Sequence, residues 1–356
     1  MPVLATALFL ITQSPQELKV PVSAIASGLE WQGLAIQEAD YTVWGASPVM
    51  DDEGRVHLFA ARWPESNVDP AWRRTSEIAH YFADNPEGPF EFVRVVAEGS
   101  DIPREWDRYA PHNPEIKRYG DTFALFYIAN TDYRQPPHPL NQTIGLMTAK
   151  SLDGPWEKHG QILAPSADKN HWSYGRQIVN PAIIEIDGNY LLYFKSSIAG
   201  VRGTVYAVAI ADNLLGPYEM PEEPITREGV MIEDGAVFKW DDKVCLITTD
   251  NHGSVTGEVG GGVLWVSEDG QNFDPKWTQL GYYRVPHYRP DIQLGAVKKI
   301  YGGAPKLERP KVLVIDGKPA YLYAPSGWAL HGGDRTANYV FRINLPTGAG
   351  PMPSKS

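Results

Sequence analysis

Three carboxylic acids stand at the starts of β-rich segments that recur along this chain of 356 residues: Glu115, Asp234 and Glu308. If these segments bring the acids into one cavity, their mutual repulsion costs free energy, which favours a functional reason for the arrangement. Such a cluster suits glycosidic bond hydrolysis, where one protonated carboxyl group protonates the leaving oxygen and another, ionised, activates water or attacks the sugar. A third carboxylate nearby raises the pKa of the acid. We expect Asp234 and Glu308 to be the acid–base pair, with Glu115 tuning it.

Polar side chains at or near the same segment starts are candidates for binding a substrate. His112 opens the second segment, and His331 lies in a Gly-rich sequence, so that either is able to act as a general acid or bind a sugar hydroxyl. The full set of binding candidates is Asp40, Ser47, His112, Asn113, Arg176, Asn180, Arg309 and His331.

A structural interpretation of these residues stays open. Glu308 is adjacent to Arg309, and Glu115 lies close to Lys117 and Arg118, so each acid has a cation with which to pair. A histidine near a turn is more often a structural hydrogen-bonding residue than a catalytic one.

The elements that must position these side chains recur five times. Each copy has a small or polar start, often with proline, then a β-rich run, an acidic or Gly turn, and a run rich in Leu, Tyr and Phe. This pattern predicts a strand, a tight Asp-Gly-type turn and a second strand. The copies are Trp44–Arg62, His112–Asn130, Val179–Ser197, Ile232–Asp250 and Leu307–Pro325.

A second pattern interleaves with the first. Its turn glycines are 66, 62 and 54 residues apart, at Gly88, Gly154, Gly216 and Gly270. The first pattern repeats at 66, 67 and 54 residues, measured at Pro48, Pro114, Pro181 and Gly235. Two independent markers that keep step indicate a real repeat. With about four short strands in each unit and no helical period, we predict an all-β fold, a five-bladed β-propeller of four-stranded antiparallel blades.

The predicted propeller also explains how distant residues meet. The innermost strand of every blade begins near one central axis, so the candidate side chains converge on one funnel. We expect the propeller to span residues 40–345, after an N-terminal segment 1–39 and before a flexible tail 346–356.

Composition limits the functions available. A net charge of −11 argues against general nucleic-acid binding, which needs a basic surface. Cys245 is the only cysteine, so no intramolecular disulfide forms, and no zinc-ligand spacing occurs. We expect no required cofactor. A structural calcium at the axis would need oxygen ligands, which Asn113, Asn180 and the acids offer without any calcium-loop motif, so the metal question stays open.

The N-terminus allows two interpretations. Val3–Ile11 is apolar apart from Thr6 and too short to span a bilayer, so we expect no stable membrane insertion. The stretch resembles the core of a secretory signal, with Ala24-Ile25-Ala26 as a cleavage site, although no Lys or Arg precedes it. A periplasmic or secreted location is favoured, with a cytoplasmic one as the alternative, in which the segment packs on the propeller.

The blade openings and the Ser-x-x-Gly-Pro-Trp-like blade endings resemble glycoside hydrolase family 43 and its propeller relatives, including family 117, over about residues 40–345. The resemblance implies a blade-one Asp before Pro as general base, where this chain has Ser47, with Asp40 as a substitute. It implies that Pro114-Glu115 tunes a pKa and that Asp234-Gly235 matches the general acid. Glu308 is a rival for that acid, because its Glu-Arg-Pro segment resembles one in exo-acting galactanase-like members.

Together these observations predict a glycosidase, exo-acting and, by the resemblance, inverting, that cleaves an oligosaccharide from a plant or algal polysaccharide. One alternative is a glycoside phosphorylase or transferase on the same scaffold, which would hold phosphate with Arg309, Arg176 and His112. Another is a carbohydrate-binding propeller without catalysis, because fold alone does not settle function.

Overall fold

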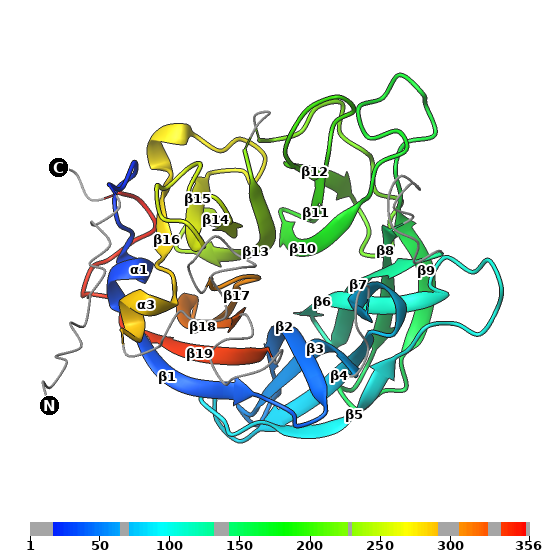
Figure 1. Ribbon diagram of the computed structural model, residues 1–356, viewed down its shortest axis with the longest axis horizontal. Coiled ribbons are helices and arrows are strands. Elements are labelled where there is room, and N and C mark those ends of the chain that lie inside the picture. Colours follow the sequence, from blue (N-terminus) through cyan, green and yellow to red (C-terminus); the bar gives the residue numbers. More distant parts are fainter. Residues whose placement is uncertain are drawn as a thin grey trace, which may run out of the picture.

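The structure, a computed structural model, describes residues 17–64, 71–131, 142–226, 230–290, 306–326 and 336–353. Its strands form five antiparallel sheets in a ring around a central axis (Figure 1). This confirms the all-β five-bladed propeller predicted from the repeat. Four sheets have four strands; the third has three among the described residues, with a single antiparallel bridge from Ile210 to Glu219 beside its last strand.

The strands follow the order of the sequence from the axis outward in four of the five sheets. The first sheet is β2 (Tyr41–Met50), β3 (Val56–Pro64), β4 (Glu77–Ala83) and β5 (Glu91–Ala97), and the second is β6 (Tyr109–Tyr119), β7 (Thr122–Asn130), β8 (Gln142–Ala149) and β9 (Glu157–Leu163). The third is β10 (Val179–Ile186), β11 (Asn189–Ser196) and β12 (Val205–Ala211), and the fourth is β13 (Ile232–Trp240), β14 (Lys243–Asp250), β15 (Gly261–Ser267) and β16 (Gln279–Tyr282). The fifth is β17 (Lys311–Ile315), β18 (Lys318–Ser326), β19 (Ala337–Ile343) and β1 (Leu29–Ile36).

The predicted tight turns connect the first two strands of the blades. Asp187 and Gly188, between β10 and β11, have φ angles of 50° and 82°, and Asp316 and Gly317, between β17 and β18, have 51° and 74°. Two successive residues with positive φ match the twist of a hairpin, which explains why the sequence places Asp-Gly at these points.

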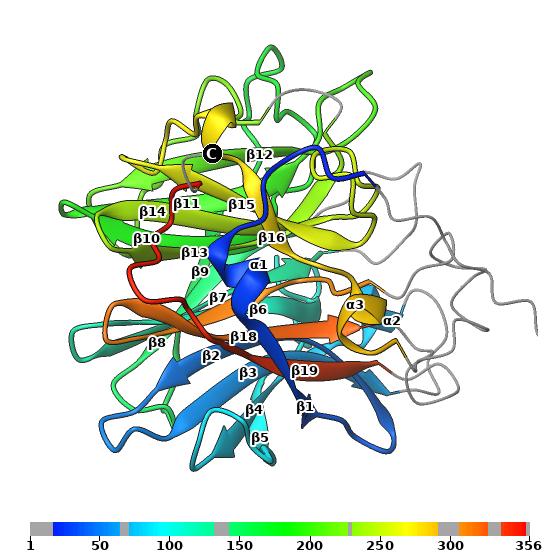
Figure 2. The ribbon, with the colours of Figure 1, turned by 90° about the vertical axis from the view of Figure 1, so that its left-hand side faces the viewer.

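The ring is closed by the N-terminal strand. β1 pairs antiparallel with β19, so that Leu29 stands opposite Ile343 and Ile36 opposite Asn338 (Figure 2). The short helix α1 (Ala24–Gly28) precedes β1 and packs against β16. Part of the segment 1–39 is therefore the outer strand of the fifth blade.

Neighbouring blades are held together by apolar side chains. Between the first and second sheets, Phe59 and Ile78 pack with Leu125, Tyr127 and Met147 in one buried cluster. Burying a side chain of this size contributes about 1.5–3 kcal/mol. The aromatic residues of the repeat thus form much of the packing between blades, which fixes the inner strands around the axis.

Every innermost strand carries the same β-bulge. In β6 the chain advances three residues from His112 to Glu115, while the partner strand advances two, from Ile128 to Phe126. The same step occurs in β2, β10 and β13. At the start of the fifth blade, the Glu308 N–H donates to the Pro325 carbonyl, and three residues later Lys311 pairs with Tyr323.

The first bulged residue has a positive φ in all five blades. These residues are Gly45 (66°), Asn113 (53°), Asn180 (59°), Asp234 (60°) and Arg309 (46°). Asn and Asp adopt this conformation more easily than most residues, whereas Arg does so rarely, and strained backbone of this kind gathers at functional sites. The bulge also corrects the alignment of the repeat, because Ala46 and not Pro48 corresponds to Pro114 and Pro181.

Gly45 is the exception among these residues because it has no side chain. A Cβ atom at Gly45 would lie 2.3 Å from Cδ and 2.6 Å from Nε of Arg309, which is fully buried. The Arg309 side chain of the fifth blade therefore fills the space that a side chain at position 45 of the first blade would need.

We predict that Gly45→Ala lowers the free energy of unfolding by roughly 3–4 kcal/mol, from its left-handed backbone and from overpacking against Arg309. The measurement is urea unfolding of both variants and the parent. Gly120→Ala is the matched control, because Gly120 has a φ of 60° but open space around it, and it should lose only about 1–2 kcal/mol. Equal losses at the two positions would contradict the packing argument.

Candidate active site

Four bulge residues from four blades form a hydrogen-bonded belt around the axis. Asn113 Nδ2 donates to Asn180 Oδ1 at 2.8 Å, and Asn180 Nδ2 donates to Asp234 Oδ1 at 2.7 Å. Arg309 Nη1 donates to the same Asp234 oxygen at 3.0 Å. We call these four residues the axial belt. Its geometry follows from the bulges, which give each blade one left-handed residue at the same level.

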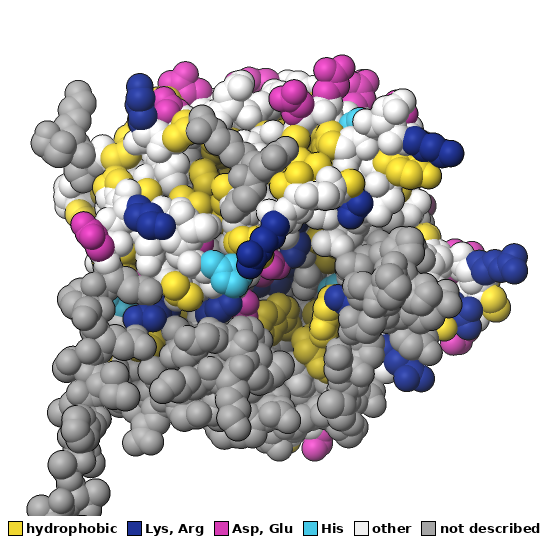
Figure 3. All heavy atoms as spheres, turned by 45° about the horizontal axis from the view of Figure 1, so that its top comes forward, with side chains coloured by type: hydrophobic (Ala, Val, Ile, Leu, Met, Phe, Trp, Pro, Cys, Tyr) yellow, Lys and Arg dark blue, Asp and Glu magenta, His cyan; other side chains and the backbone are white. Residues whose placement is uncertain are grey.

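The residue before each belt position lies on one side of the belt. In the second, fourth and fifth blades these residues are His112, Glu233 and Glu308. We call this the open side, because the Glu233 side chain keeps 30% of its surface exposed. In a space-filling view, acidic, basic and histidine side chains gather around a recess near the middle of the face (Figure 3). The open side therefore exposes the Glu233 carboxyl group to solvent, while Glu308 is buried on the same side.

Glu308 is protonated at neutral pH. Its burial raises its pKa to about 8, the negative charges of Asp234 and Glu233 act in the same direction, and Lys306 and Lys195 oppose them. A carboxyl group in this state is able to donate a proton near neutral pH.

Glu233 is in the opposite state. Burial raises its pKa, but the Lys195 ammonium group, which contacts its Oε2, outweighs burial and holds the pKa below the usual value. Lys195 comes from β11, where it pairs with Val179, the residue before the belt position Asn180. The third blade has the apolar Val179 at the position where the fourth blade has Glu233, and Lys195 adds a charged group beside it. Glu233 is thus an ionised carboxylate next to a protonated one.

Asp234 differs from both because it belongs to the belt. Burial and the neighbouring Glu233 raise its pKa, while Arg309 and Lys195 act against them. Its Oδ1 accepts the two hydrogen bonds from Asn180 and Arg309, so that its orientation is fixed by the protein. The structure therefore brings the predicted pair Asp234 and Glu308 together, with Glu233 as a third acid.

His112 uses both ring nitrogens inside the protein. Its Nδ1 lies 2.6 Å from the Ala110 carbonyl, to which it donates, and its Nε2 accepts from Gln142 Nε2 at 3.2 Å. Burial lowers the pKa of His112 to about 3, so the ring is neutral at ordinary pH. These contacts are those of a structural histidine that supports the second blade.

Glu115 lies on the other side of the belt, two residues after Asn113. It is 1% exposed, contacts the Lys311 ammonium group and lies 3.3 Å from Lys117 Nζ. Burial raises its pKa, but the two lysines outweigh burial and keep the pKa below the usual value. Ser47 Oγ lies 3.5 Å from Glu115 and accepts from the Ile116 N–H at 3.1 Å. The third predicted acid is therefore part of a buried ion pair.

We predict that Lys311→Met lowers the free energy of unfolding by about 3–5 kcal/mol, because it leaves the buried Glu115 charge without its main partner. Denaturant unfolding measures the loss. The double variant Glu115→Gln, Lys311→Met should recover most of it, since removing both charges leaves no buried ion. A double variant as unstable as the single one would show that the lysine acts by packing alone.

The other binding candidates are spread more widely. Asp40 is exposed in the connection between β1 and β2, and Arg176 is half-buried in the turn before β10. His331 lies outside the described residues.

The three predicted acids lie at three different levels along the axis. Glu308 directly precedes the belt residue Arg309, Asp234 is itself a belt residue, and Glu115 follows the belt residue Asn113 by two positions. This difference explains why Glu115 is separated from the other two acids.

Two further features bear on ligands. Among the described residues, no group of three or more His, Cys, Asp or Glu side chains is placed to hold a metal ion. The belt also suits a cation poorly, because Arg309 brings a positive charge to the Asp234 oxygen. The sequence left a structural calcium at the axis as an open question, and it stays open. Within the described part of the chain, no helix is long and apolar enough to cross a bilayer.

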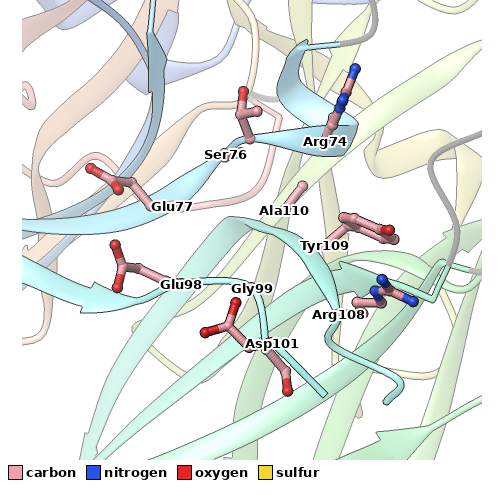
Figure 4. A pocket seen from close by; sticks show the side chains of 11 residues that line it. Arg74, Ser76, Glu77, Glu98, Gly99, Asp101, Arg108, Tyr109 and Ala110 are labelled. Carbon is pink, nitrogen blue, oxygen red and sulfur yellow. The ribbon is translucent and has the colours of Figure 1, made fainter. Parts of the chain in front are cut away.

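A separate polar cleft lies between the outer strands of the first blade and the start of the second (Figure 4). Charged side chains of both signs line it, among them Arg74, Glu77, Glu98, Asp101 and Arg108. None of the predicted site residues lines this cleft, so the axial acids remain the candidate site.

Comparisons with known proteins agree with the fold. No family model matches the sequence. The probable arabinan endo-1,5-alpha-L-arabinosidase B of Aspergillus fumigatus is 27% identical over 125 residues, which is 33% of this chain and 32% of that protein. The match thus spans about a third of this curated relative's length.

Solved structures match over almost the whole chain. A family 117 glycoside hydrolase of the marine bacterium Zobellia galactanivorans has a TM-score of 0.69 at 14% identity, covering 91% of this chain and 92% of that one. A thermostable family-43 glycoside hydrolase has a TM-score of 0.57 at 16% identity, covering 91% and 97%. The predicted resemblance to propeller glycoside hydrolases is confirmed at the level of the fold.

Proposed function

We propose that the protein is a glycoside hydrolase, with Glu308 as the general acid and Glu233 as the carboxylate that activates water. The feature that carries this proposal is the pair of Glu308 and Glu233 on the open side of the belt, because burial and Asp234 raise the pKa of Glu308 while Lys195 lowers the pKa of Glu233. Neighbouring carboxyl groups whose environments push their pKa values apart are the usual mark of an acid and its partner base. The shared fold with glycoside hydrolases of families 43 and 117 supports the same reaction class.

Asp234 has a different role in this proposal from the one that the sequence predicted. Its negative charge raises the pKa of Glu308, so it tunes the acid, and the sequence had assigned that role to Glu115. Glu115 is held in its ion pair with Lys311 and acts on the stability of the axis.

The belt supports an exo-acting enzyme. The side chains of Asn113, Asn180, Asp234 and Arg309 join across the axis, and Ser47, Glu115 and Lys311 are buried behind them. A recess with a closed floor accepts the end of a sugar chain more readily than its middle. We propose inversion of the anomeric carbon from the resemblance to family 43, and an oligosaccharide of a plant or algal polysaccharide as the substrate.

A screen of oligosaccharides in phosphate-free buffer tests the proposal, with the anomer of the first product followed by NMR. Arabino-oligosaccharides belong in the screen because the fungal relative is named for arabinan. We expect hydrolysis from the chain end with an inverted product. Turnover that requires inorganic phosphate would identify a phosphorylase, and sugar binding without turnover would identify a non-catalytic propeller; either result overturns the proposal.

A further inference from the structure

The axis is positively charged in a strongly acidic protein. Among the residues that the structure describes, five cationic side chains surround the belt and its two sides: Lys117, Lys195, Lys306, Arg309 and Lys311. Four carboxyl groups of the same described residues lie among them, and with Glu308 protonated at most three are ionised. The chain as a whole has a net charge of −11. The axial excess of positive charge is therefore a local feature that composition does not explain.

Two of these cations have hydrogen-bond donors that the described residues do not satisfy. Arg309 is fully buried and uses Nη1 for Asp234, while its Nε and Nη2 have no hydrogen-bond partner within the described part of the chain. Lys195 has three N–H donors, and its one hydrogen bond among these residues goes to Glu233. A buried donor without an acceptor costs about 1–3 kcal/mol. The missing partner is an acceptor, and the surrounding charge favours an anionic one.

We propose that the sugar bound on the open side carries an anionic group, a carboxylate or a sulfate ester, and that Arg309 and Lys195 receive it. This inference rests on the proposed function for the place of the sugar. Hydrogen bonds between a charged donor and an anion are roughly twice as strong as neutral ones, and Arg matches the two oxygens of a carboxylate or sulfate. A neutral sugar would leave the positive charge at the axis without a counter-charge.

Calorimetry with a matched set of sugars tests the anionic group directly. Galactose, galacturonate and galactose 6-sulfate differ only at C6, and each is titrated into the full chain. We expect the anionic sugars to bind at least about tenfold more tightly than galactose, which corresponds to one charge-assisted hydrogen bond. The anionic sugar that binds more tightly shows whether the site prefers a carboxylate or a sulfate ester. Equal or weaker binding of both anions, or no detectable binding of either at millimolar concentration, overturns the inference.

Variants then assign the preference to the axis. Lys195→Met should lose the preference for the anionic sugar while its circular dichroism stays that of the parent. Lys150→Met is the control, because Lys150 is exposed and pairs with Asp121 on the surface. A preference that survives Lys195→Met and Arg309→Lys would place the anion elsewhere and overturn the assignment.

Failure of this inference is distinguishable from failure of the proposed function. Cleavage of neutral oligosaccharides alone, with no gain from an anionic group, would leave the hydrolase standing and overturn the inference. Tight binding of galacturonate or galactose 6-sulfate without cleavage of any oligosaccharide would support the anion site and overturn the hydrolase.

Discussion

Replacing Glu308 by Gln is expected to lower kcat by about 10²–10⁴-fold, the range that a positioned general acid contributes. The glutamine side chain would keep the shape and hydrogen-bonding capacity of the protonated acid but has no proton to give to the leaving oxygen. Because Glu308 is already neutral at pH 7, the substitution removes no charge and the variant should fold as the parent does. The measurement is kcat on the best oligosaccharide of the screen.

The pH profile supplies the second readout for Glu308. A general acid works in its protonated form, and this fraction falls as the pH rises through the pKa of Glu308, about 8. The parent should therefore lose activity above pH 8, and the residual activity of Glu308→Gln should lack this decline. Glu157→Gln, at an exposed position on the outer strand β9, serves as the control and should match the parent. A Glu308→Gln variant with more than a tenth of the parent's kcat would contradict the assignment.

Much of the fold was predictable because its signals are local. Asp187-Gly188 and Asp316-Gly317 each mark a hairpin on their own, and the period of the repeat counts the blades. The strand β1 escaped this reasoning, since Leu29–Ile36 has no hairpin partner beside it in the sequence and pairs with β19 at the other end of the chain. Ring closure is a long-range contact that no short pattern encodes.

The candidate site was predictable only in part, because the β-bulge in each inner strand decides how far along the axis a given side chain lies. The sequence placed Ser47 at the same level as all three acids, whereas the bulge aligns Ser47 with Glu115 alone and aligns Gly45 with Asn113 and Asp234. The alignment of the blades on their prolines therefore treated residues before, at and after the belt positions as equivalent. The signal that would have helped is the second bulged residue, which is small or proline in every blade.

The ion pairs at the site were hidden for a related reason. Lys195 lies in the second strand of its blade and reaches Glu233 of the next blade, and Lys311 pairs with Glu115 across 196 residues of sequence. Without these partners the sequence offered no way to separate an ionised acid from a protonated one. No role was predicted for Glu233 from the sequence, although its lysine gives it the ionised state that a base requires.

Removing the Glu233 carboxylate gives the other large effect that we expect. Glu233→Ala should lower kcat by about 10²–10⁴-fold, because no carboxylate then activates the attacking water. Azide added to this variant should restore part of the rate and yield a glycosyl azide, since azide fits the vacated space and attacks without losing a proton. Asp234→Asn separates the two neighbouring acids: it should weaken the acid Glu308 but gain nothing from azide. Azide rescue of Asp234→Asn together with an active Glu233→Ala would instead assign the base to Asp234, which the sequence placed in the acid–base pair without fixing its role.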